Sequence, residues 1–283
     1  MNHILSIKKE SLGYYLRNSK NKINFIIGII YAYKNRLFVL TNIFGVLKRK
    51  ITIYKMKNGI NYLARSNDIP VINDMFINKQ YHNFLNEIKN NSIVIDIGAH
   101  IGVFSILAAT LGKNIQVYSY EPSEENFKIL KRNIRLNNLH NIYPFKLAVS
   151  KKKGKRILFL NENPAENSFF VKKGKKVMVD TITLKGILDS NNISSCDLLK
   201  MDCEGAEYEI LFNTPKNYIK KIKNICLEYH DNYDVKKLKN FLEDNGFSIL
   251  LDKKKTPIIF IKGKKIPSLF AERENSLLFA ENL

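Results

Sequence analysis

The sequence predicts an α/β fold built around a mostly parallel sheet, and three observations lead to this expectation. Between residues 93 and 230, short apolar segments alternate with longer amphipathic ones, as strands do when helices join them. A turn containing two glycines, residues 96–102, follows the first of these strands directly. The chain has 283 residues and is 45% hydrophobic, enough for the full core of one large or two smaller domains.

Residues 1–80 are expected to form an N-terminal extension. Apolar residues recur at helical spacing as far as about residue 48. Residues 51–65 then alternate between apolar and polar on both sides of Asn58-Gly59, which is a strong signal for a β-hairpin. A short helix is expected to begin after Asp68 and to end near Asn78.

Residues 81–283 are expected to form the α/β domain. Its first helix is predicted at 81–88, and the later helices at 102–111, 124–137, 184–188, 206–211 and 235–245. Its principal strands are predicted at 93–96, 117–121, 143–149, 197–202 and 225–229. A β-hairpin excursion is predicted at 155–160 and 176–181, with later strands at 247–251, 258–261 and 277–280.

The net charge of +20 suggests a polyanionic partner such as a nucleic acid or an anionic membrane. Only 8 of the 46 basic residues are Arg, however, and phosphate recognition relies on the planar fork of Arg. Lys, Asn and Ile dominate together, as they do in AT-rich genomes, so much of the basicity has a simpler origin. The three cysteines have no paired spacing, which disfavours both a disulfide framework and a structural zinc site.

Two apolar segments lie near the N-terminus, at Phe25–Tyr33 and Leu37–Leu47. Both are shorter than the roughly 18 apolar residues that a membrane-spanning helix needs. The sequence therefore predicts no transmembrane segment, a cytoplasmic location, and packing of these helices against the core. Peripheral membrane contact through this region stays open as an alternative.

The turn Asp96-Ile97-Gly98-Ala99-His100-Ile101-Gly102 is the first motif that carries chemistry. It joins a strand to a helix, and its glycines permit a sharp turn and close approach of a ligand. Its spacing differs from the dinucleotide motif G-x-G-x-x-G. An acidic residue before the turn would repel a pyrophosphate, whereas it suits a cationic ligand such as S-adenosylmethionine. We expect Asp96 to face the ammonium group of that ligand.

Glu121 stands at the end of the second strand of the α/β domain. In doubly wound folds, an acidic residue at this position accepts hydrogen bonds from both ribose hydroxyls. It therefore points to a ligand with an unphosphorylated ribose.

Four polar residues form a third constellation, at the ends of the fourth and fifth strands. Asp202 and Glu204 are two residues apart, so on an extended chain they would face the same way, and Glu228 and His230 repeat this spacing. Three uses stay open. Asp202 or His230 would serve as the general base for a hydroxyl. Asp202, Glu204 and Glu228 would offer oxygen ligands to Mg²⁺. The last alternative is structural, with Glu204 or Glu207 capping the next helix.

The order of these motifs resembles the FkbM family of S-adenosylmethionine-dependent methyltransferases. The resemblance covers about residues 50–283, and its most specific part is the segment KMDCEGAE at 200–207. It implies a class I methyltransferase fold, a Rossmann-like sheet whose seventh strand is antiparallel, supplied here by Ser276 to Glu281. It also implies O-methylation of a hydroxyl on a sugar or a secondary metabolite, that is, of a small-molecule or glycan acceptor.

The resemblance further implies a set of residues that bind S-adenosylmethionine. Asp96, Gly98, His100 and Gly102 would contact its methionine part. Glu121 would bind the ribose with Pro122 beside it, and Ala148 would lie next to the adenine. The acceptor is expected to bind over the fourth and fifth strand ends, bounded by residues 161–175, the hairpin at 51–65 and the helix at 70–80.

Two alternatives to this function remain at this point. One is a basic, non-catalytic module that retains the fold and binds a polyanion. The other is a methyltransferase for the ribose of RNA, for which Lys200 and Asp202 are suggestive, although the catalytic tetrad of such enzymes is incomplete by spacing. The absence of a Pro-Cys pair and of an N-P-P-Y loop lowers the expectation of a nucleic-acid substrate.

Overall fold

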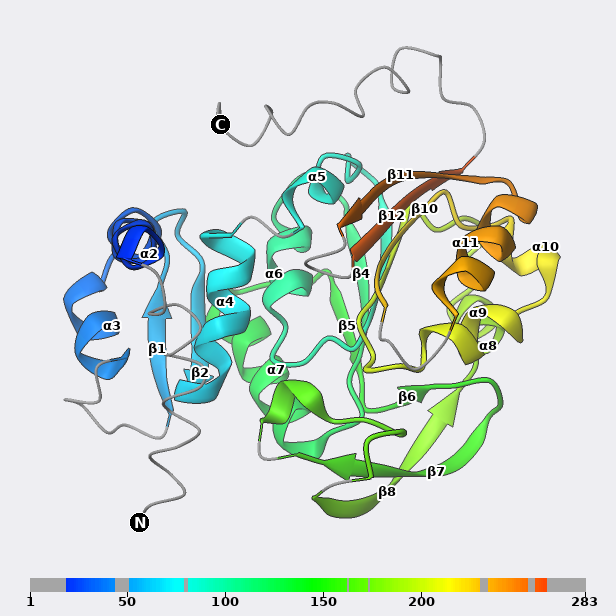
Figure 1. Cartoon of the computed structure of the whole chain (residues 1–283), viewed down its shortest axis with the longest axis horizontal. Coiled ribbons are helices and arrows are strands. Elements are labelled where there is room, and N and C mark those ends of the chain that lie inside the picture. The colour runs from blue at the N-terminus through cyan, green and yellow to red at the C-terminus, as the bar shows by residue number, and fades with distance from the viewer. Residues whose placement is uncertain are drawn as a thin grey trace.

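A seven-stranded sheet forms the centre of the protein (Figure 1). The computed structural model describes residues 19–43, 51–78, 81–161, 163–172, 174–229, 234–253 and 258–263. The sheet order is β11-β12-β10-β9-β3-β4-β5. The strands are β3 (Ile93–Ile97), β4 (Gln116–Tyr120), β5 (Ile142–Phe145), β9 (Leu198–Met201), β10 (Asn224–Glu228), β11 (Phe247–Lys253) and β12 (Ile258–Gly263). The five strands from β10 to β5 pair in parallel, which confirms the predicted fold class.

The antiparallel strand of this sheet is β12, which corrects the expectation for Ser276 to Glu281. β12 pairs antiparallel with β10 on one side and with β11 on the other. β12 is the next strand after β11 in the sequence and pairs with it as an antiparallel neighbour. The apolar segment 258–261 therefore lies between β11 and β10. Ser276 to Glu281 lie outside the described residues.

Helices cover both faces of the sheet (Figure 1). One layer contains α5 (His82–Leu85), α6 (Val103–Ala109) and α7 (Glu124–Leu136); the other contains α8 (Leu184–Ser190), α9 (Glu207–Phe212), α10 (Lys216–Ile219) and α11 (Val235–Asp244). Strand residues alternate between two cores, so that Val94 packs in the first layer and Ile95 in the second. Because both faces of these strands are buried, the strands are continuous apolar segments in the sequence.

The predicted third strand is shorter than expected. β5 ends at Phe145, and the chain then joins a separate three-stranded sheet through β6 (Ala148–Val149). The other two strands, β7 (Gly154–Leu160) and β8 (Lys175–Ile182), form the predicted hairpin excursion. This small sheet holds the segment between β7 and β8 next to the carboxyl ends of the central strands.

The N-terminal extension contains α2 (Ser19–Ala32), α3 (Arg36–Ile43), the hairpin β1 (Ile51–Lys55) and β2 (Asn61–Arg65), the short helix η1 (Ser66–Asp68) and α4 (Ile69–Phe76). The antiparallel pairing of β1 with β2 confirms the predicted hairpin, with Gly59 at φ 96° in its turn. The buried residues of the extension belong to the same core as those of α6 and α7. The boundary at residue 80 stays a prediction.

Two asparagines, one in α7 and one at its C-cap, attach the extension to the α/β domain. Asn133 exchanges hydrogen bonds with the backbone of Leu63 at 2.6 and 3.0 Å, and Asn137 does the same with Asn61 at 2.8 and 2.7 Å. Four helical residues rise about 6 Å, which nearly matches two residues of a strand. The two side-chain amides therefore form the hydrogen bonds that a neighbouring strand would form with β2, and they fix its position.

The structure also bears on membrane contact. In the described ranges, no helix has both the length and the apolar character needed to cross a bilayer. Ile29, Tyr33 and Val39 are buried as expected, whereas Tyr31 and Leu37 are exposed. Peripheral contact stays a prediction.

Candidate active site

A cavity of about 400 Å³ opens at the carboxyl ends of the central parallel strands. This is the edge at which open α/β sheets bind ligands, and the volume lies in the range of small-molecule sites. The helix α4 and the segment 163–169 line the rest of it. The lining includes most of the residues expected from the sequence: Gly98, His100, Glu121, Pro122, Ala148, Asp202, Glu204 and Glu228.

The glycine turn has three residues at positive φ, Gly98 at 77°, His100 at 51° and Gly102 at 89°, and of these only His100 has a side chain that makes this conformation costly. A Cβ on Gly98 would lie 1.8 Å from the carbonyl oxygen of Asp202, so this glycine allows the turn to pass against the end of β9. A Cβ on Gly102 would lie 2.4 Å from Leu130, so Gly102 allows α6 to pack against α7. Gly102 is absent from the cavity lining, in contrast to its expected contact with the cofactor.

We predict that Gly98→Ala destabilises the protein by roughly 1–3 kcal/mol through backbone overpacking, and that it also weakens ligand binding. The matched control is Gly59→Ala, because Gly59 has a similar positive φ but no atom within 4 Å of the added Cβ. Thermal unfolding of both variants measures the difference. Equal losses would mean that φ strain, and not the contact with Asp202, explains the glycine.

Asp96 comes from β3 and lies at the start of the glycine turn. Its carboxylate is fully buried and is absent from the cavity lining. It forms an ion pair with Lys200 at 3.1 Å and accepts a hydrogen bond from Ser105 at 2.5 Å. Lys200 in turn donates to the carbonyl oxygen of Gly98 at 2.9 Å. The pair therefore supports the glycine turn, and the contact of Asp96 with the ammonium of S-adenosylmethionine stays a prediction.

Lys200 comes from β9 and is almost completely buried. Burial by itself would lower its pKa, but the charges of Asp96 and Asp202 outweigh this and raise it. Lys200 therefore stays a cation, and the sequence signal for it is a Lys inside an otherwise apolar strand.

Glu121 follows β4 and lies at the cavity, as expected. It is buried, and its pKa is raised because burial outweighs the hydrogen bonds that it accepts. Its Oε2 accepts from the backbone N–H of His100 at 2.9 Å, and its Oε1 accepts from that of Ser123 at 2.9 Å. Oε1 also accepts from Nδ2 of Asn126 at 3.3 Å, so Oε2 is the oxygen that keeps a further lone pair for a ligand.

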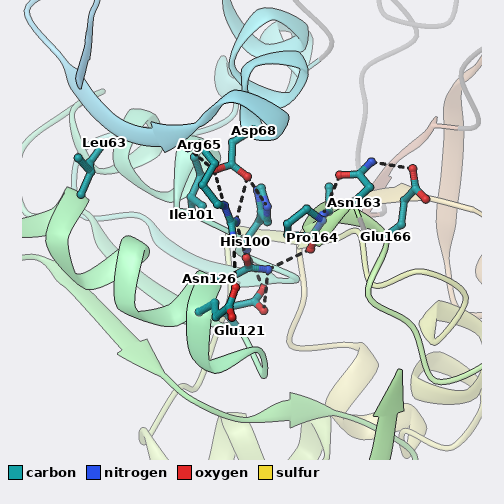
Figure 2. Close-up of polar contacts among 12 residues, drawn as sticks. Leu63, Arg65, Asp68, His100, Ile101, Glu121, Asn126, Asn163, Pro164 and Glu166 are labelled. Carbon is teal, nitrogen blue, oxygen red and sulfur yellow. Dashed lines mark hydrogen bonds and ion pairs between the residues drawn. The ribbon is translucent and has the colours of Figure 1, made fainter. Parts of the chain in front are cut away.

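His100 lies between the cavity and the N-terminal extension (Figure 2). Its Nε2 lies 3.3 Å from Oδ1 of Asp68, a contact that is electrostatic and not a well-aligned hydrogen bond. Its Nδ1 is buried and has no hydrogen-bond partner in the described part of the chain. An unsatisfied buried nitrogen beside a cavity fits a polar ligand, since such atoms are costly to leave unpaired.

The carboxylates after β9 and β10 line the other side of the cavity. Asp202, Glu204 and Glu228 all contribute, which confirms that neighbouring strands bring them together. Glu204 has φ 54°, so it stands in a turn and not on the extended chain assumed from its spacing. Tyr81 donates to Asp202 at 3.4 Å, a contact that the sequence does not signal. His230 lies outside the described residues, so its role stays a prediction.

The described residues hold no group of three or more His, Cys, Asp or Glu side chains arranged to bind a metal ion. The acidic lining is therefore not accompanied by a recognisable Mg²⁺ site within that part of the chain. The structural alternative stays a prediction: Glu207 accepts a hydrogen bond from the Cys203 amide at 2.8 Å, in the turn before α9, and this bond does not cap the helix. Burial and the charge of Glu207 raise the pKa of Cys203, which disfavours a nucleophilic thiolate.

The family model described as "Methyltransferase FkbM domain" matches residues 96–249, more than half of the chain. The protein belongs to the FkbM methyltransferase family. The resemblance seen in the sequence is thereby confirmed. The matched region begins at Asp96, so it contains the glycine turn, Glu121 and the acidic strand ends but none of the N-terminal extension.

Two relatives of this FkbM methyltransferase are similar in sequence over more than half of the chain. Methyltransferase sdnD of Sordaria araneosa is 26% identical over 59% of this chain and 77% of its own. Hexuronic acid methyltransferase AglP of Haloferax volcanii is 21% identical over 64% of this chain and 74% of its own. Among solved structures, magnesium protoporphyrin IX methyltransferase of Synechocystis aligns with a TM-score of 0.42 and 13% identity, covering 70% of this chain and 83% of that one.

Proposed function

We propose that this FkbM methyltransferase transfers the methyl group of S-adenosylmethionine to a hydroxyl oxygen of a sugar or a secondary metabolite. One observation carries the proposal. A single cavity contains a buried acidic ribose acceptor, Glu121, on one side and the carboxylates of Asp202, Glu204 and Glu228 on the other. The hexuronic acid named for the Haloferax relative supports a sugar as the class of acceptor, while the charge of the acceptor follows from the cavity of this chain.

The residues at the glycine turn fit S-adenosylmethionine. Glu121 suits the two hydroxyls of an unphosphorylated ribose, and Gly98, His100, Pro122 and Ala148 line the same part of the cavity. When bound, the cofactor supplies a methyl group on a sulfonium, which is already a good electrophile. The contribution of the protein is therefore mostly to position the acceptor and exclude water.

Asp202 is our candidate for the group that takes or orients the proton of the acceptor hydroxyl. It lines the cavity, is partly exposed, and its Oδ2 accepts from Tyr81 and lies 3.9 Å from Lys200. These neighbours hold the carboxylate in one orientation. His230 comes two residues after the end of β10 in the sequence and remains the alternative base.

The charge of the cavity favours a neutral acceptor over an anionic one. Although the chain carries +20, Asp202, Glu204 and Glu228 make the acceptor side acidic, and the lysine nearby is paired with Asp96. A phosphate or a uronate would meet this side at an electrostatic cost. This supports an uncharged hydroxyl acceptor over the ribose of RNA and over a polyanion-binding module.

The test is a transfer assay with labelled S-adenosylmethionine against neutral saccharides, hexuronates, small phenols and RNA. We expect methylation of neutral hydroxyl compounds, unaffected by chelator. Asp202→Asn should lower turnover by roughly 10²–10⁴-fold while leaving cofactor affinity nearly intact.

The same assay on His230→Ala distinguishes the two candidate bases. A loss confined to the His230 variant would move the role from Asp202 to His230. Loss of activity with EDTA and its recovery with Mg²⁺ would overturn the metal-free proposal.

A further inference from the structure

Arg65 and Asp68, both in the N-terminal extension, form a buried ion pair next to the glycine turn (Figure 2). Asp68 is fully buried. It accepts hydrogen bonds from the backbone N–H of Arg65 at 2.8 Å and from Nε and Nη2 of the same residue, each at 2.9 Å. Burial would raise the pKa of Asp68, but the contact with His100 and the hydrogen bonds and charge of Arg65 lower it below its usual value. The result is a carboxylate held in one fixed position.

Oδ1 of Asp68 lies 3.3 Å from Nε2 of His100. His100 is held at its other end by Glu121, which accepts a hydrogen bond from its backbone N–H. Its φ of 51° is uncommon for a residue with a side chain and needs support from its surroundings. Asp68 and Glu121 together supply that support from opposite sides.

A second branch of the same network starts at the guanidinium of Arg65. Nη2 donates to Oδ1 of Asn126 at 2.6 Å. Because the amide oxygen is used in this way, its Nδ2 faces Oε1 of Glu121 at 3.3 Å and the carbonyl oxygen of Pro164 at 3.0 Å. Arg65 thus fixes the orientation of an amide that contacts both Glu121 and the segment covering the cavity.

Hydrogen bonds attach the N-terminal extension to the α/β domain and so fix the position of Arg65 and Asp68. Asn133 of α7 and Asn137 at its C-cap bind the backbone of β2 just before Arg65. Asn133 also donates to the carbonyl oxygen of Ile101 in the glycine turn at 2.9 Å. The hydroxyl of Tyr62 donates to the carbonyl oxygen of Val103 at 3.1 Å. Arg65 and Asp68 therefore keep a constant position relative to His100 and Glu121.

We propose that Arg65 and Asp68 are positioning residues of the cofactor site, acting through His100 and Asn126 to hold the glycine turn and Glu121 in their binding geometry. Both lie outside the matched family region, which begins at residue 96. The extension is thus part of the cofactor site and not an appendage to it. This inference rests on the proposed use of S-adenosylmethionine.

The experiment measures the affinity of the full chain for S-adenosylmethionine by titration calorimetry, well below the unfolding temperature of each variant. Asp68→Asn keeps the size of the side chain and removes its charge. We expect the dissociation constant to rise about tenfold, as for the loss of one charge-assisted interaction. Arg65→Lys keeps the charge but loses the fork, so we expect a similar loss.

Glu125→Gln is the matched control. Glu125 also contacts the guanidinium of Arg65, at 3.7 Å, but its side chain is 80% exposed. Its contact with Arg65 is long and exposed to solvent, and it makes no direct contact with His100 among the described ion pairs, so its variant should bind the cofactor as the wild type does. Unchanged affinity in Asp68→Asn, or an equal loss in Glu125→Gln, would overturn the proposal.

A double-mutant cycle separates positioning from a general structural role. If Asp68 acts through His100, Asp68→Asn should cause little further loss in a His100→Asn background. An equal loss in both backgrounds would contradict the proposed route through His100.

Hydrogen exchange of the His100 amide gives a readout that needs no ligand. It should become faster in Asp68→Asn and stay unchanged in Glu125→Gln. A wild type that fails to bind S-adenosylmethionine would contradict the proposed function. The exchange rates would then still decide whether Asp68 holds the turn.

Discussion

Glu121→Ala is expected to weaken S-adenosylmethionine binding by roughly 30- to 1,000-fold, which corresponds to about 2–4 kcal/mol. The variant removes a charged acceptor for two ribose hydroxyls. It also releases the backbone amides of His100 and Ser123 that shape the site. Titration calorimetry measures the loss.

The control is Glu124→Ala, three residues further along. Glu124 is about half exposed and pairs only with Lys128 and Lys146 among the ion pairs of the described residues. It should leave the affinity unchanged. A Glu121 variant that binds like the wild type would remove this residue from the cofactor site.

The same site should show a characteristic pH dependence. Burial raises the pKa of Glu121 above its ordinary value of 4.5, so the carboxyl takes up a proton at a higher pH than an exposed Glu would. Only the ionised form accepts from both ribose hydroxyls. Affinity should therefore be full above the raised pKa and be lost as the pH falls through it. This decline should be absent in Glu121→Gln.

Lys200→Met is expected to lower the free energy of unfolding by roughly 3–5 kcal/mol. The substitution keeps the length of the side chain but leaves the carboxylate of Asp96 buried without its countercharge. It also removes the hydrogen bond to the carbonyl oxygen of Gly98, so the glycine turn loses its support. Chemical denaturation at neutral pH measures the effect.

Two further variants test the explanation. Lys223→Met removes an ion pair with Asp197 at a position that is 61% exposed, so it should cost no more than about 1 kcal/mol. The double variant Lys200→Met/Asp96→Asn should recover much of the lost stability, since no unpaired charge then remains. A double variant as unstable as the single one would show that packing, and not charge, explains the role of Lys200.

Local patterns were sufficient to predict most of the fold. Continuous apolar strands alternating with amphipathic helices indicate a buried parallel sheet, and alternation on both sides of Asn58-Gly59 indicates a hairpin; the structure has both. The antiparallel strand was assigned wrongly, because 258–261 and 277–280 are similar short apolar segments. Strand pairing is a long-range choice that neither segment encodes by itself.

The cavity followed from the same topology. The carboxyl ends of parallel strands lie at one edge of a sheet, so residues that follow those strands meet there whatever their separation in sequence. Glu121, Asp202 and Glu228 line the cavity for this reason. The hairpin at 51–65 was expected to border it, yet this hairpin, described throughout, contributes no lining residue.

The sequence by itself determined the family, the order of the strands along the chain and the acidic residues that follow them, because these depend on spacing within short segments. Only the tertiary structure decided the partner of each charge. Asp96 pairs with Lys200, 104 positions away, and Asp68 of the N-terminal extension contacts His100 of the glycine turn, and the spacing in the sequence signals neither contact. A buried charge must be compensated by whichever group the fold brings near it, and that group is set by packing, not by its place in the chain.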